Sequence, residues 1–262
     1  MTVNQTKGKI YLVGVGPGEP KLLTDQCKEV LSGVDFVVGY ALYVDQVRHL
    51  AINGQCETWQ IGEELERAQR VIDLASEGNS VAMVSSGDIG IYGMSGPIFN
   101  LLSQQGWNGS SPEIEVVPGI SALQSASALL GSPLMQDFCT ISLSNLLTPW
   151  EDIEERIHAA SHGDFVVVFY NPKSKARDWQ LRDAFITLKS HRPGETPVGL
   201  VKNAYREGQN IVLCNLDNVL DKYDYIDMFT TVVVGNSSSY VHAEKFITPR
   251  GYEKKLGVSD EK

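Results

Sequence analysis

Residues 9–15 (KIYLVGV) form a continuous β-prone run that ends in glycine and proline, and the pattern of an amphipathic helix follows it directly. An apolar run without alternation is typical of a strand that is buried on both faces of a sheet. The apolar residues after it recur at the spacing of one helix face: Cys27, Val30, Leu31 and Val34. Thr24 stands where an N-cap is needed, so we expect a strand, a glycine loop and a helix in that order.

The same order repeats along the first half of the chain. Residues 35–39 and 80–85 have the composition of two further strands, and the positions between them mark one helix face: Leu65, Ala68, Ile72 and Ala75. Strands that alternate with helices are joined by crossover connections, which favour a parallel sheet flanked by helices. The sequence therefore predicts an α/β fold.

A break at Pro118 and Gly119, directly after a strand predicted over residues 113–117, marks the expected boundary between two domains. We expect an N-terminal α/β domain over residues 1–117, a C-terminal α/β domain over 118–252 and a polar, frayed tail over 253–262. The length of 262 residues fits one large domain or two of about 100–150 residues each, and the break favours two.

The second domain is expected to contain a mixed sheet. Strands are predicted over residues 138–143, 165–170, 198–202 and 230–234, with a hairpin around residues 206–209. One helix is predicted over residues 121–130, and a second begins at a capping box in which Thr148 is the N-cap, Pro149 the first helical residue and Glu151 the third. A third helix carries Leu181, Ala184, Phe185 and Leu188 on one face, with residues 173–177 as its solvated start.

The chain carries 22 Lys and Arg against 32 Asp and Glu, a formal net charge of −10. This balance argues against extended contact with nucleic acid or with an anionic membrane. There is no basic leader with a cleavage site and no apolar run long enough to span a bilayer, so we expect a cytoplasmic protein with buried, reduced cysteines. The four cysteines and five histidines show no metal-ligand spacing, and G-x-S-x-G is absent, which disfavours metal and acyl-enzyme chemistry.

Glycine-rich or polar segments follow several predicted strands, at the end of a parallel sheet where ligands bind. They are GVGPGE (14–19), SSGDIGIYGM (85–94), VPGISA (117–122), FYNP (169–172) and VKNAYREGQ (201–209). The first lacks the third glycine of a dinucleotide fingerprint and the G-K-[ST] of a phosphate loop. Simpler interpretations stay open: a tight turn at the glycine loop, an Asx turn at Asp88, an N-cap at Ser121 and a solvated side chain at Arg206.

The order of these segments resembles the tetrapyrrole methylase family, whose members use S-adenosylmethionine to methylate ring carbons. The similarity runs from about residue 9 to residue 252. SGDIGIYGM, FYNP, NAYREGQ and ITPRGY most resemble the members that methylate carbon 17 of precorrin-3B or of cobalt-factor III. The resemblance implies methylation coupled to ring contraction in cobalamin biosynthesis.

The resemblance also implies a homodimer of two-domain subunits, with S-adenosylmethionine in the cleft between the domains and S-adenosylhomocysteine as a product. It assigns the cofactor to Pro17, Ser86, Gly87, Asp88, Ile91, Ser121, Ala122, Tyr170, Asn171 and Ala204. The chain departs from the usual family pattern at Ile89, where many members have proline, and at Glu19, where aspartate is usual. No metal is required, because the methyl group of a sulfonium is already activated.

Three charged residues have expected roles toward the tetrapyrrole. Glu19, beside the glycine loop, is our hypothesis for an acid/base residue. Arg206 and Lys202 are expected to bind substrate carboxylates, because a chain with a net charge of −10 needs local basic groups to hold a polycarboxylate ring.

Other functions stay open beside this one. The alternatives are another tetrapyrrole methylase of the same pathway and a nucleotide-binding module without turnover. A ribosomal-RNA ribose methylase or a diphthine synthase would share the glycine loop, but the acidic charge disfavours an RNA substrate and the GIYGM and NAYREGQ segments fit neither enzyme.

Overall fold

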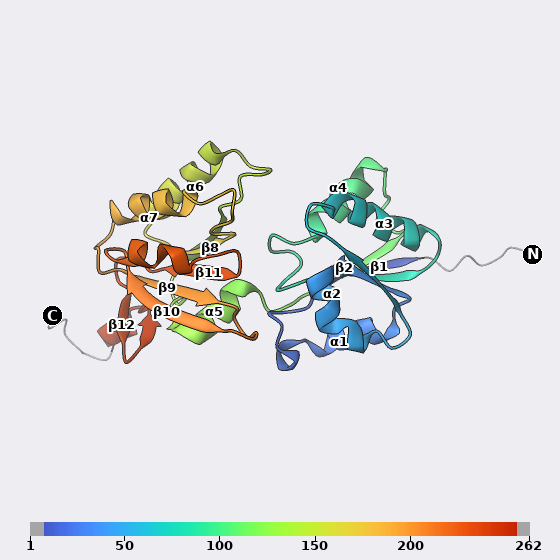
Figure 1. The fold of residues 1–262 in the computed structure, drawn as a ribbon, viewed down its shortest axis with the longest axis horizontal. Coiled ribbons are helices and arrows are strands. Elements are labelled where there is room, and N and C mark those ends of the chain that lie inside the picture. Colours follow the sequence, from blue (N-terminus) through green and yellow to red (C-terminus); the bar gives the residue numbers. More distant parts are fainter. Residues whose placement is uncertain (1–7, 256–262) are drawn as a thin grey trace, which may run out of the picture. The chain divides into compact units, whose positions relative to one another are not determined.

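The computed structural model describes residues 8–255. The chain divides into two compact units, Met1–Ala122 and Leu123–Lys262 (Figure 1). The boundary expected after residue 117 falls at the end of the last strand of the first unit, whereas the division comes after the loop that follows. That loop is hydrogen-bonded to the first unit through the Gly119 amide.

The first unit contains a five-stranded parallel sheet in the order β3-β2-β4-β1-β5. The strands are β1 (Lys9–Gly14), β2 (Phe36–Tyr40), β3 (Gln55–Trp59), β4 (Ser80–Ser85) and β5 (Glu113–Val117). Every pairing is parallel, so all five strands end at the same edge of the sheet. The predicted parallel α/β arrangement is confirmed.

Helices cover both faces of this sheet (Figure 1). The covering helices are α1 (Asp25–Gly33), α2 (Ala41–Val47), α3 (Glu64–Ser76) and α4 (Ser95–Gln104), and the short helices η1 (Pro20–Leu22) and η2 (Arg48–Leu50) lie in the connections. Alternate residues of β1 enter different cores: Ile10 and Leu12 pack with α3 and α4, whereas Val13 packs with α1 and α2. Because side chains alternate between two covered faces, residues 10–13 of β1 are all apolar or aromatic.

Two local predictions for the first unit have different outcomes. The Thr24 side chain accepts a hydrogen bond from the Cys27 amide at 3.1 Å and caps α1 as expected. Leu65 was wrongly placed on the buried face of α3, because it is 62% exposed while Ala68 and Ile72 are buried. The unpredicted residue on that face is Arg67, which is 4% exposed.

The second unit contains a mixed sheet in the order β10-β9-β11-β8-β7. Its strands are β7 (Phe138–Ser142), β8 (Val166–Tyr170), β9 (Pro197–Lys202), β10 (Asn210–Asn215) and β11 (Thr230–Val234). The β7–β8 pair is parallel, and the pairs of β11 with β8, of β11 with β9 and of β9 with β10 are antiparallel. Strands β7, β8 and β9 therefore run in one direction and end at one edge, which confirms the predicted mixed sheet and hairpin.

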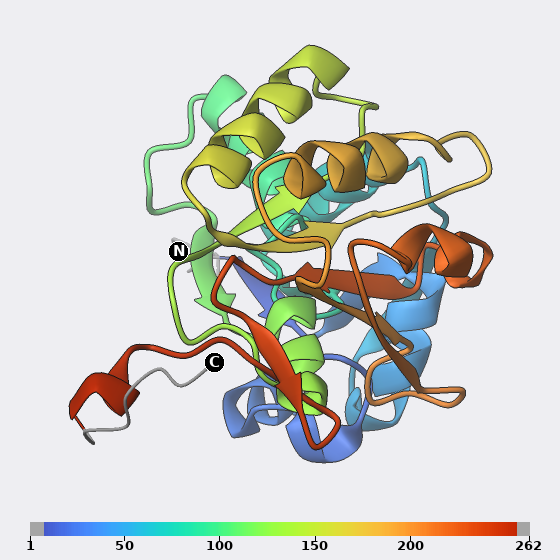
Figure 2. The ribbon, with the colours of Figure 1, turned by 90° about the vertical axis from the view of Figure 1, so that its left-hand side faces the viewer.

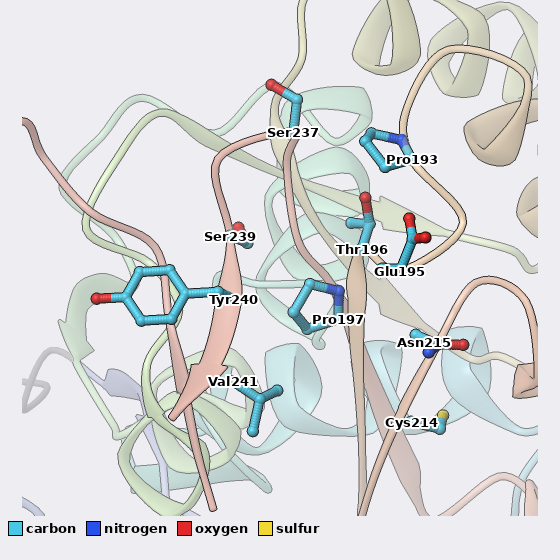
Figure 3. Close-up of a pocket in the computed structure, with 10 residues that line it drawn as sticks. All are labelled: Pro193, Glu195, Thr196, Pro197, Cys214, Asn215, Ser237, Ser239, Tyr240 and Val241. Carbon is cyan, nitrogen blue, oxygen red and sulfur yellow. The ribbon is translucent and has the colours of Figure 1, made fainter. Parts of the chain in front are cut away.

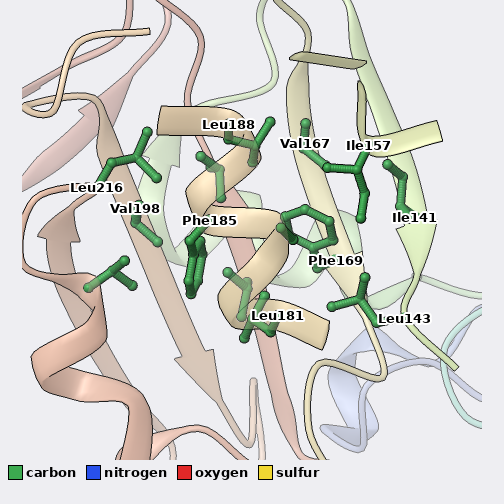
Figure 4. Close-up of a cluster of buried hydrophobic side chains, with 14 of the residues drawn as sticks. Ile141, Leu143, Ile157, Val167, Phe169, Leu181, Phe185, Leu188, Val198 and Leu216 are labelled. Carbon is green, nitrogen blue, oxygen red and sulfur yellow. The ribbon is translucent and has the colours of Figure 1, made fainter. Parts of the chain in front are cut away.

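Helices also cover both faces of the second sheet, with α6 and α7 on one side and α5 on the other (Figure 2). The remaining elements are α5 (Ala122–Leu130), α6 (Trp150–His162), α7 (Gln180–Lys189), η3 (Val219–Tyr225), η4 (Tyr252–Lys255) and a small sheet of β6 (Gly131–Ser132), β12 (Tyr240–His242) and β13 (Lys245–Ile247). Phe169 of β8 packs with Leu181, Phe185 and Leu188 of α7 in the larger core (Figure 4).

Two local predictions for the second unit are wrong. Helix α6 begins at Trp150 with Pro149 as its N-cap, and no side chain caps it, so the expected capping box at Thr148 does not form. Residues 173–177 are not the start of α7, because Ser174 and Arg177 are paired in a tight antiparallel bridge and the helix begins only at Gln180. Of the predicted tail, residues 253–255 belong to η4 and residues 256–262 lie outside the described part of the chain.

Candidate active site

Three loops of the first unit meet where the neighbouring strands β4, β1 and β5 end. The Val15 amide donates to the Ser85 carbonyl at 2.9 Å. Gly16 and Gly87 then exchange two backbone hydrogen bonds, with the Gly16 amide 3.0 Å from the Gly87 oxygen and the Gly87 amide 2.7 Å from the Gly16 oxygen. The glycine loop and the SSGD segment are therefore joined by main-chain bonds.

Glycine is required where these loops cross. A Cβ on Gly119 would lie 2.2 Å from the Gly87 carbonyl oxygen and 2.6 Å from the Gly14 carbonyl oxygen. A Cβ on Gly14 would lie 2.7 Å from the same Gly87 oxygen. Gly87 itself has a φ of +64°, a left-handed conformation that glycine adopts without steric cost. Close packing of backbone on backbone thus fixes the shape of this edge.

Asp88 connects two of the three loops. One carboxylate oxygen accepts a hydrogen bond from the Gly90 amide at 2.8 Å, which is the Asx turn that the sequence left open. The other oxygen accepts from the Gly119 amide at 3.0 Å, a contact that the sequence did not indicate. Each oxygen has a second lone pair, so these bonds leave Asp88 able to accept from a ligand.

The predicted cofactor residues of the first unit all lie in these loops. Pro17 and Ser121 are buried, and the half-buried ones are Ser86, Gly87, Asp88, Ile91 and Ala122. Ile89, the departure from the family pattern, is fully buried in the core with Met94 and Ile98. Its apolar side chain thus packs into the core of the first unit and is not exposed at the edge where the strands end.

Glu19 stands at the far end of the glycine loop. It is the N-cap of the short helix η1, and its side chain accepts from the Lys21 amide at a long 3.4 Å. The half-buried carboxylate is therefore loosely held. This geometry gives Glu19 a capping role and leaves the acid/base role a hypothesis.

In the second unit, Tyr170 and Asn171 lie at the end of β8. The Tyr170 hydroxyl accepts from the Leu123 amide in the first turn of α5 at 2.9 Å. Asn171 has a left-handed φ of 51°, and its side-chain amide donates to the Ser142 hydroxyl at the end of β7 over 3.0 Å. The hydroxyl and amide are thus positioned by neighbouring elements of the same unit.

Sequence reasoning missed two residues that position Asn171. Ser142 ends a strand that was predicted, but nothing in the sequence paired it with FYNP. Arg177 is 6% exposed and donates from Nε to the Asn171 carbonyl at 3.2 Å, and burial lowers the pKa of its guanidinium. The basic run 173–177 hid this residue, because a string of charges usually indicates a solvated surface.

Lys202 is the last residue of β9, and Ala204 and Arg206 lie in the loop between β9 and β10. Ala204 is half-buried against the core that α5 covers. Lys202 forms an ion pair with Asp227, with Nζ 2.6 Å from Oδ2, so its charge is already matched. The half-buried Arg206 lies in a turn in which its amide donates to the Asn203 carbonyl at 2.9 Å.

Left-handed backbone recurs at non-glycine residues of the same loops. Tyr92 has a φ of 53°, Asn171 of 51°, Asn203 of 49° and Tyr205 of 58°. Such conformations cost on the order of 1–3 kcal/mol each and persist where the surroundings impose them, which is common at ligand sites. Three of the five predicted site segments contain such a residue: 85–94, 169–172 and 201–209.

A surface pocket of about 460 Å³ lies elsewhere in the second unit (Figure 3). It is lined by Thr196, Pro197, Cys214 and Tyr240 among others, and shares no residue with the predicted site. Pro197 begins β9 and Lys202 ends it, so the pocket lies at the opposite edge of the sheet, about 17 Å away along the strand.

Among residues 8–255, no group of three or more His, Cys, Asp or Glu residues is placed to hold a metal ion. All four cysteines are free thiols, Cys27 being buried and the other three half-buried. No helix of this part of the chain is long and apolar enough to cross a membrane.

The fold and the glycine-lined loops define an α/β protein of two units that is similar to known methylases. The model of the family "Tetrapyrrole (Corrin/Porphyrin) Methylases" matches residues 9–220. The chain belongs to this family, and the predicted membership is confirmed.

Individual relatives sharpen this assignment. The chain is 47% identical to the "Cobalt-factor III methyltransferase" of Priestia megaterium over 97% of its own length, but it spans about half (47%) of that relative. It is 43% identical to the "Probable cobalt-factor III C(17)-methyltransferase" of Salmonella typhimurium, over 93% of this chain and 99% of the relative. The crystal structure of the methyltransferase CobJ is similar with a TM-score of 0.86 and 32% identity, covering 92% of this chain and 100% of that one.

Proposed function

We propose that this chain transfers a methyl group from S-adenosylmethionine to carbon 17 of cobalt-factor III, with coupled ring contraction, in cobalamin biosynthesis. The observation that carries the proposal is the end-to-end match to the Salmonella typhimurium relative, which covers 93% of this chain and 99% of that protein. A match over both full lengths supports a shared reaction better than a shared fold does.

The loop residues fit a compact, charged cofactor. Gly87 packs directly against the loop after β5, because a Cβ there would lie 3.6 Å from the Ser121 Cα and from the Ala122 amide nitrogen. The N-terminus of α5 begins at Ala122, and a helix N-terminus favours a carboxylate. Pro17, Asp88, Tyr170 and Asn171 would complete the binding set. When bound, S-adenosylmethionine supplies a methyl group on an activated sulfonium leaving group.

The residues of this chain then have a positioning task. Methyl transfer needs the attacking ring carbon held in line with the bond that breaks, in a site from which water is excluded. In the first unit, Asp88 and the glycine crossing fix the loops after β1, β4 and β5, and in the second unit Ser142 and Arg177 position Asn171. Glu19 and Arg206 stay our proposals for a proton-transfer residue and a carboxylate-binding residue.

Incubation of the purified chain with methyl-labelled S-adenosylmethionine tests the proposal. With cobalt-factor III or precorrin-3B, we expect one labelled methyl group per ring, at carbon 17 by NMR. Faster turnover of the cobalt compound supports our choice of substrate. Methylation at another carbon favours another methylase of the pathway, and cofactor binding without transfer to either compound favours a nucleotide-binding module.

We also propose that the chain forms a homodimer, which the family resemblance implies. Light scattering with size-exclusion chromatography should give twice the chain mass of 28.8 kDa. A mass of one chain at micromolar concentration contradicts the dimer without touching the proposed reaction.

A further inference from the structure

Two strands flank β8 in the second sheet, with β7 on one side and β11 on the other. The loop after β7 and the loop before β11 leave the sheet at the edge where Tyr170 and Asn171 lie, because β7 runs parallel to β8 and β11 runs antiparallel to it. Adjacent strands are about 4.8 Å apart, so the two loops start about 10 Å from each other.

Both loops present apolar side chains to solvent. Leu146 and Leu147, after β7, are 83% and 99% exposed, and Met228 and Phe229, before β11, are 47% and 55% exposed. The main chain of Phe229 is fixed, because its amide donates to Asp227 Oδ1 at 2.9 Å and its carbonyl accepts from the Asn203 amide at 3.1 Å. We name these four residues the apolar flanks.

A single exposed apolar side chain needs no explanation, but two pairs on either side of a candidate site do. Exposure of a leucine-sized side chain forgoes the free energy that its burial would supply. The flanks therefore favour an occupant with an extended apolar surface that lies over Tyr170 and Asn171.

A basic turn over residues 173–177 follows β8, the strand between the two that carry the flank loops. Lys173 donates to the Tyr223 carbonyl at 3.1 Å, and Arg177 to the Asn171 carbonyl at 3.2 Å, so both are engaged in the fold. Lys175 is exposed and forms no ion pair with any residue that the structure describes. An exposed ammonium group at the same edge of the sheet as two apolar loops suits a ligand with apolar faces and a carboxylate rim.

We propose that the apolar flanks and Lys175 bind the tetrapyrrole: Leu147 and Phe229 contact the macrocycle, and Lys175 contacts a peripheral carboxylate. This inference rests on the proposed function, which supplies the occupant. It adds substrate-binding residues that the sequence did not indicate, since Lys175 was assigned to a solvated helix start. It also supplies a basic group, since Lys202 is neutralised by Asp227.

The test compares three variants of the full chain with a matched control. They are Leu147→Ser, Phe229→Ser and Lys175→Ala, and the control is Ile186→Ser, an apolar residue of α7 that is 61% exposed. We expect each of the three variants to raise KM for cobalt-factor III by about tenfold, which for the two flank residues is the effect of losing roughly one leucine-sized contact. The affinity for S-adenosylmethionine, the thermal midpoint and the control should stay as in the wild type.

Three results would overturn the inference. One is a KM for the tetrapyrrole within twofold of wild type in all three variants, measured on protein that turns over cobalt-factor III. Another is a change in oligomeric mass with unchanged KM, which would make the flanks a contact between copies of this chain. The third is an equal loss of cofactor and tetrapyrrole binding. If the wild type neither binds nor methylates a tetrapyrrole, the proposed function is wrong. The inference about the flanks is then wrong as well, because it takes its ligand from that function.

Discussion

The Asp88 carboxylate, in the loop after β4, accepts a hydrogen bond at 3.0 Å from the amide of Gly119, which lies 31 residues further along the chain in the loop after β5. The contact is half-buried, and it holds the loop after β5 against the SSGD segment. Asp88 therefore positions the site whether or not it also touches the cofactor.

The first prediction concerns Asp88→Asn. An amide in this place keeps one acceptor oxygen but brings a donor toward a second backbone amide, so one of the two hydrogen bonds is lost. We expect a loss of about 1–3 kcal/mol in the free energy of unfolding by urea, with weaker S-adenosylmethionine binding by calorimetry. Asp73→Asn on the exposed side of α3 is the charge-matched control. Equal stability of both variants would contradict the role of Asp88 in holding the two loops together.

Gly119→Ala tests the glycine crossing. The added methyl would lie 2.2 Å from a backbone oxygen, so we expect a loss of more than about 3 kcal/mol, beyond ordinary overpacking. Gly96→Ala is the control, because a Cβ there meets no atom within 4 Å and alanine favours the helix. Its urea midpoint should stay or rise. A Gly119→Ala protein that unfolds at the wild-type midpoint is incompatible with the described crossing.

Glu19→Gln separates a capping role from a proton-transfer role. Glutamine still offers an oxygen to the Lys21 amide, so the thermal midpoint should not change. If Glu19 transfers a proton, kcat falls by roughly 100-fold or more and the pH profile loses one limb. Full turnover with an unchanged pH dependence removes Glu19 from the chemistry.

The ion pair of Lys202 with Asp227 predicts a pH-dependent stability. Burial raises the pKa of Asp227, but hydrogen bonds from Lys202, the Phe229 amide and Thr230 outweigh it, so the pKa is lowered from its ordinary 3.8. The stabilisation is therefore present above pH 3.8 and lost as the pH falls below it. Lys202→Met should cost less than about 1 kcal/mol at pH 7 and nothing in strong acid, as measured by urea unfolding.

The same variant also tests the expected substrate role of Lys202. Because its charge is matched by Asp227, we expect Lys202→Met to change KM for the tetrapyrrole less than Arg206→Ala does. Arg206→Ala should leave S-adenosylmethionine binding near the wild-type value. A larger KM effect from Lys202 than from Arg206 would restore Lys202 as a substrate ligand.

Three cysteines should be unreactive at neutral pH. Burial raises the pKa of Cys27, Cys139 and Cys214 to about 11 each. At pH 8 the folded protein should react with iodoacetamide at these sites much more slowly than the protein in urea, as mass spectrometry can show. The same shift predicts that stability falls as the pH rises from about 9 to 11, because the unfolded thiols ionise first. Rapid labelling of Cys27 at pH 8 would contradict its burial.

Elements whose signals are local could be predicted from the sequence. Thr24 caps α1 as expected, since an N-cap needs only the amide three residues on. The face of Leu181, Ala184, Phe185 and Leu188 is buried throughout, since its spacing is helical and uninterrupted. The family resemblance then assigned the segments at the strand ends to a site.

Features that depend on distant partners could not be predicted. The bond from Gly119 to Asp88 joins loops of two different strands, and the bond from Asn171 to Ser142 needs the order of the second sheet. Thr148 has the spacing of a capping box, yet α6 begins one residue later than that spacing requires. Arg177 belongs to a basic run by composition, but the bridge with Ser174 turns it inward.

The crossing of the loops at Gly14, Gly87 and Gly119 has a consequence for the thermodynamics of ligand binding. The hydrogen bonds between Gly16 and Gly87 and from Gly119 to Asp88 are made within the chain, so they order these loops as part of the folding reaction. Ordering a loop residue costs roughly 1–2 kcal/mol of conformational entropy. A cofactor that meets this surface is spared that cost, and we expect its association rate to be limited by diffusion and desolvation and not by loop closure.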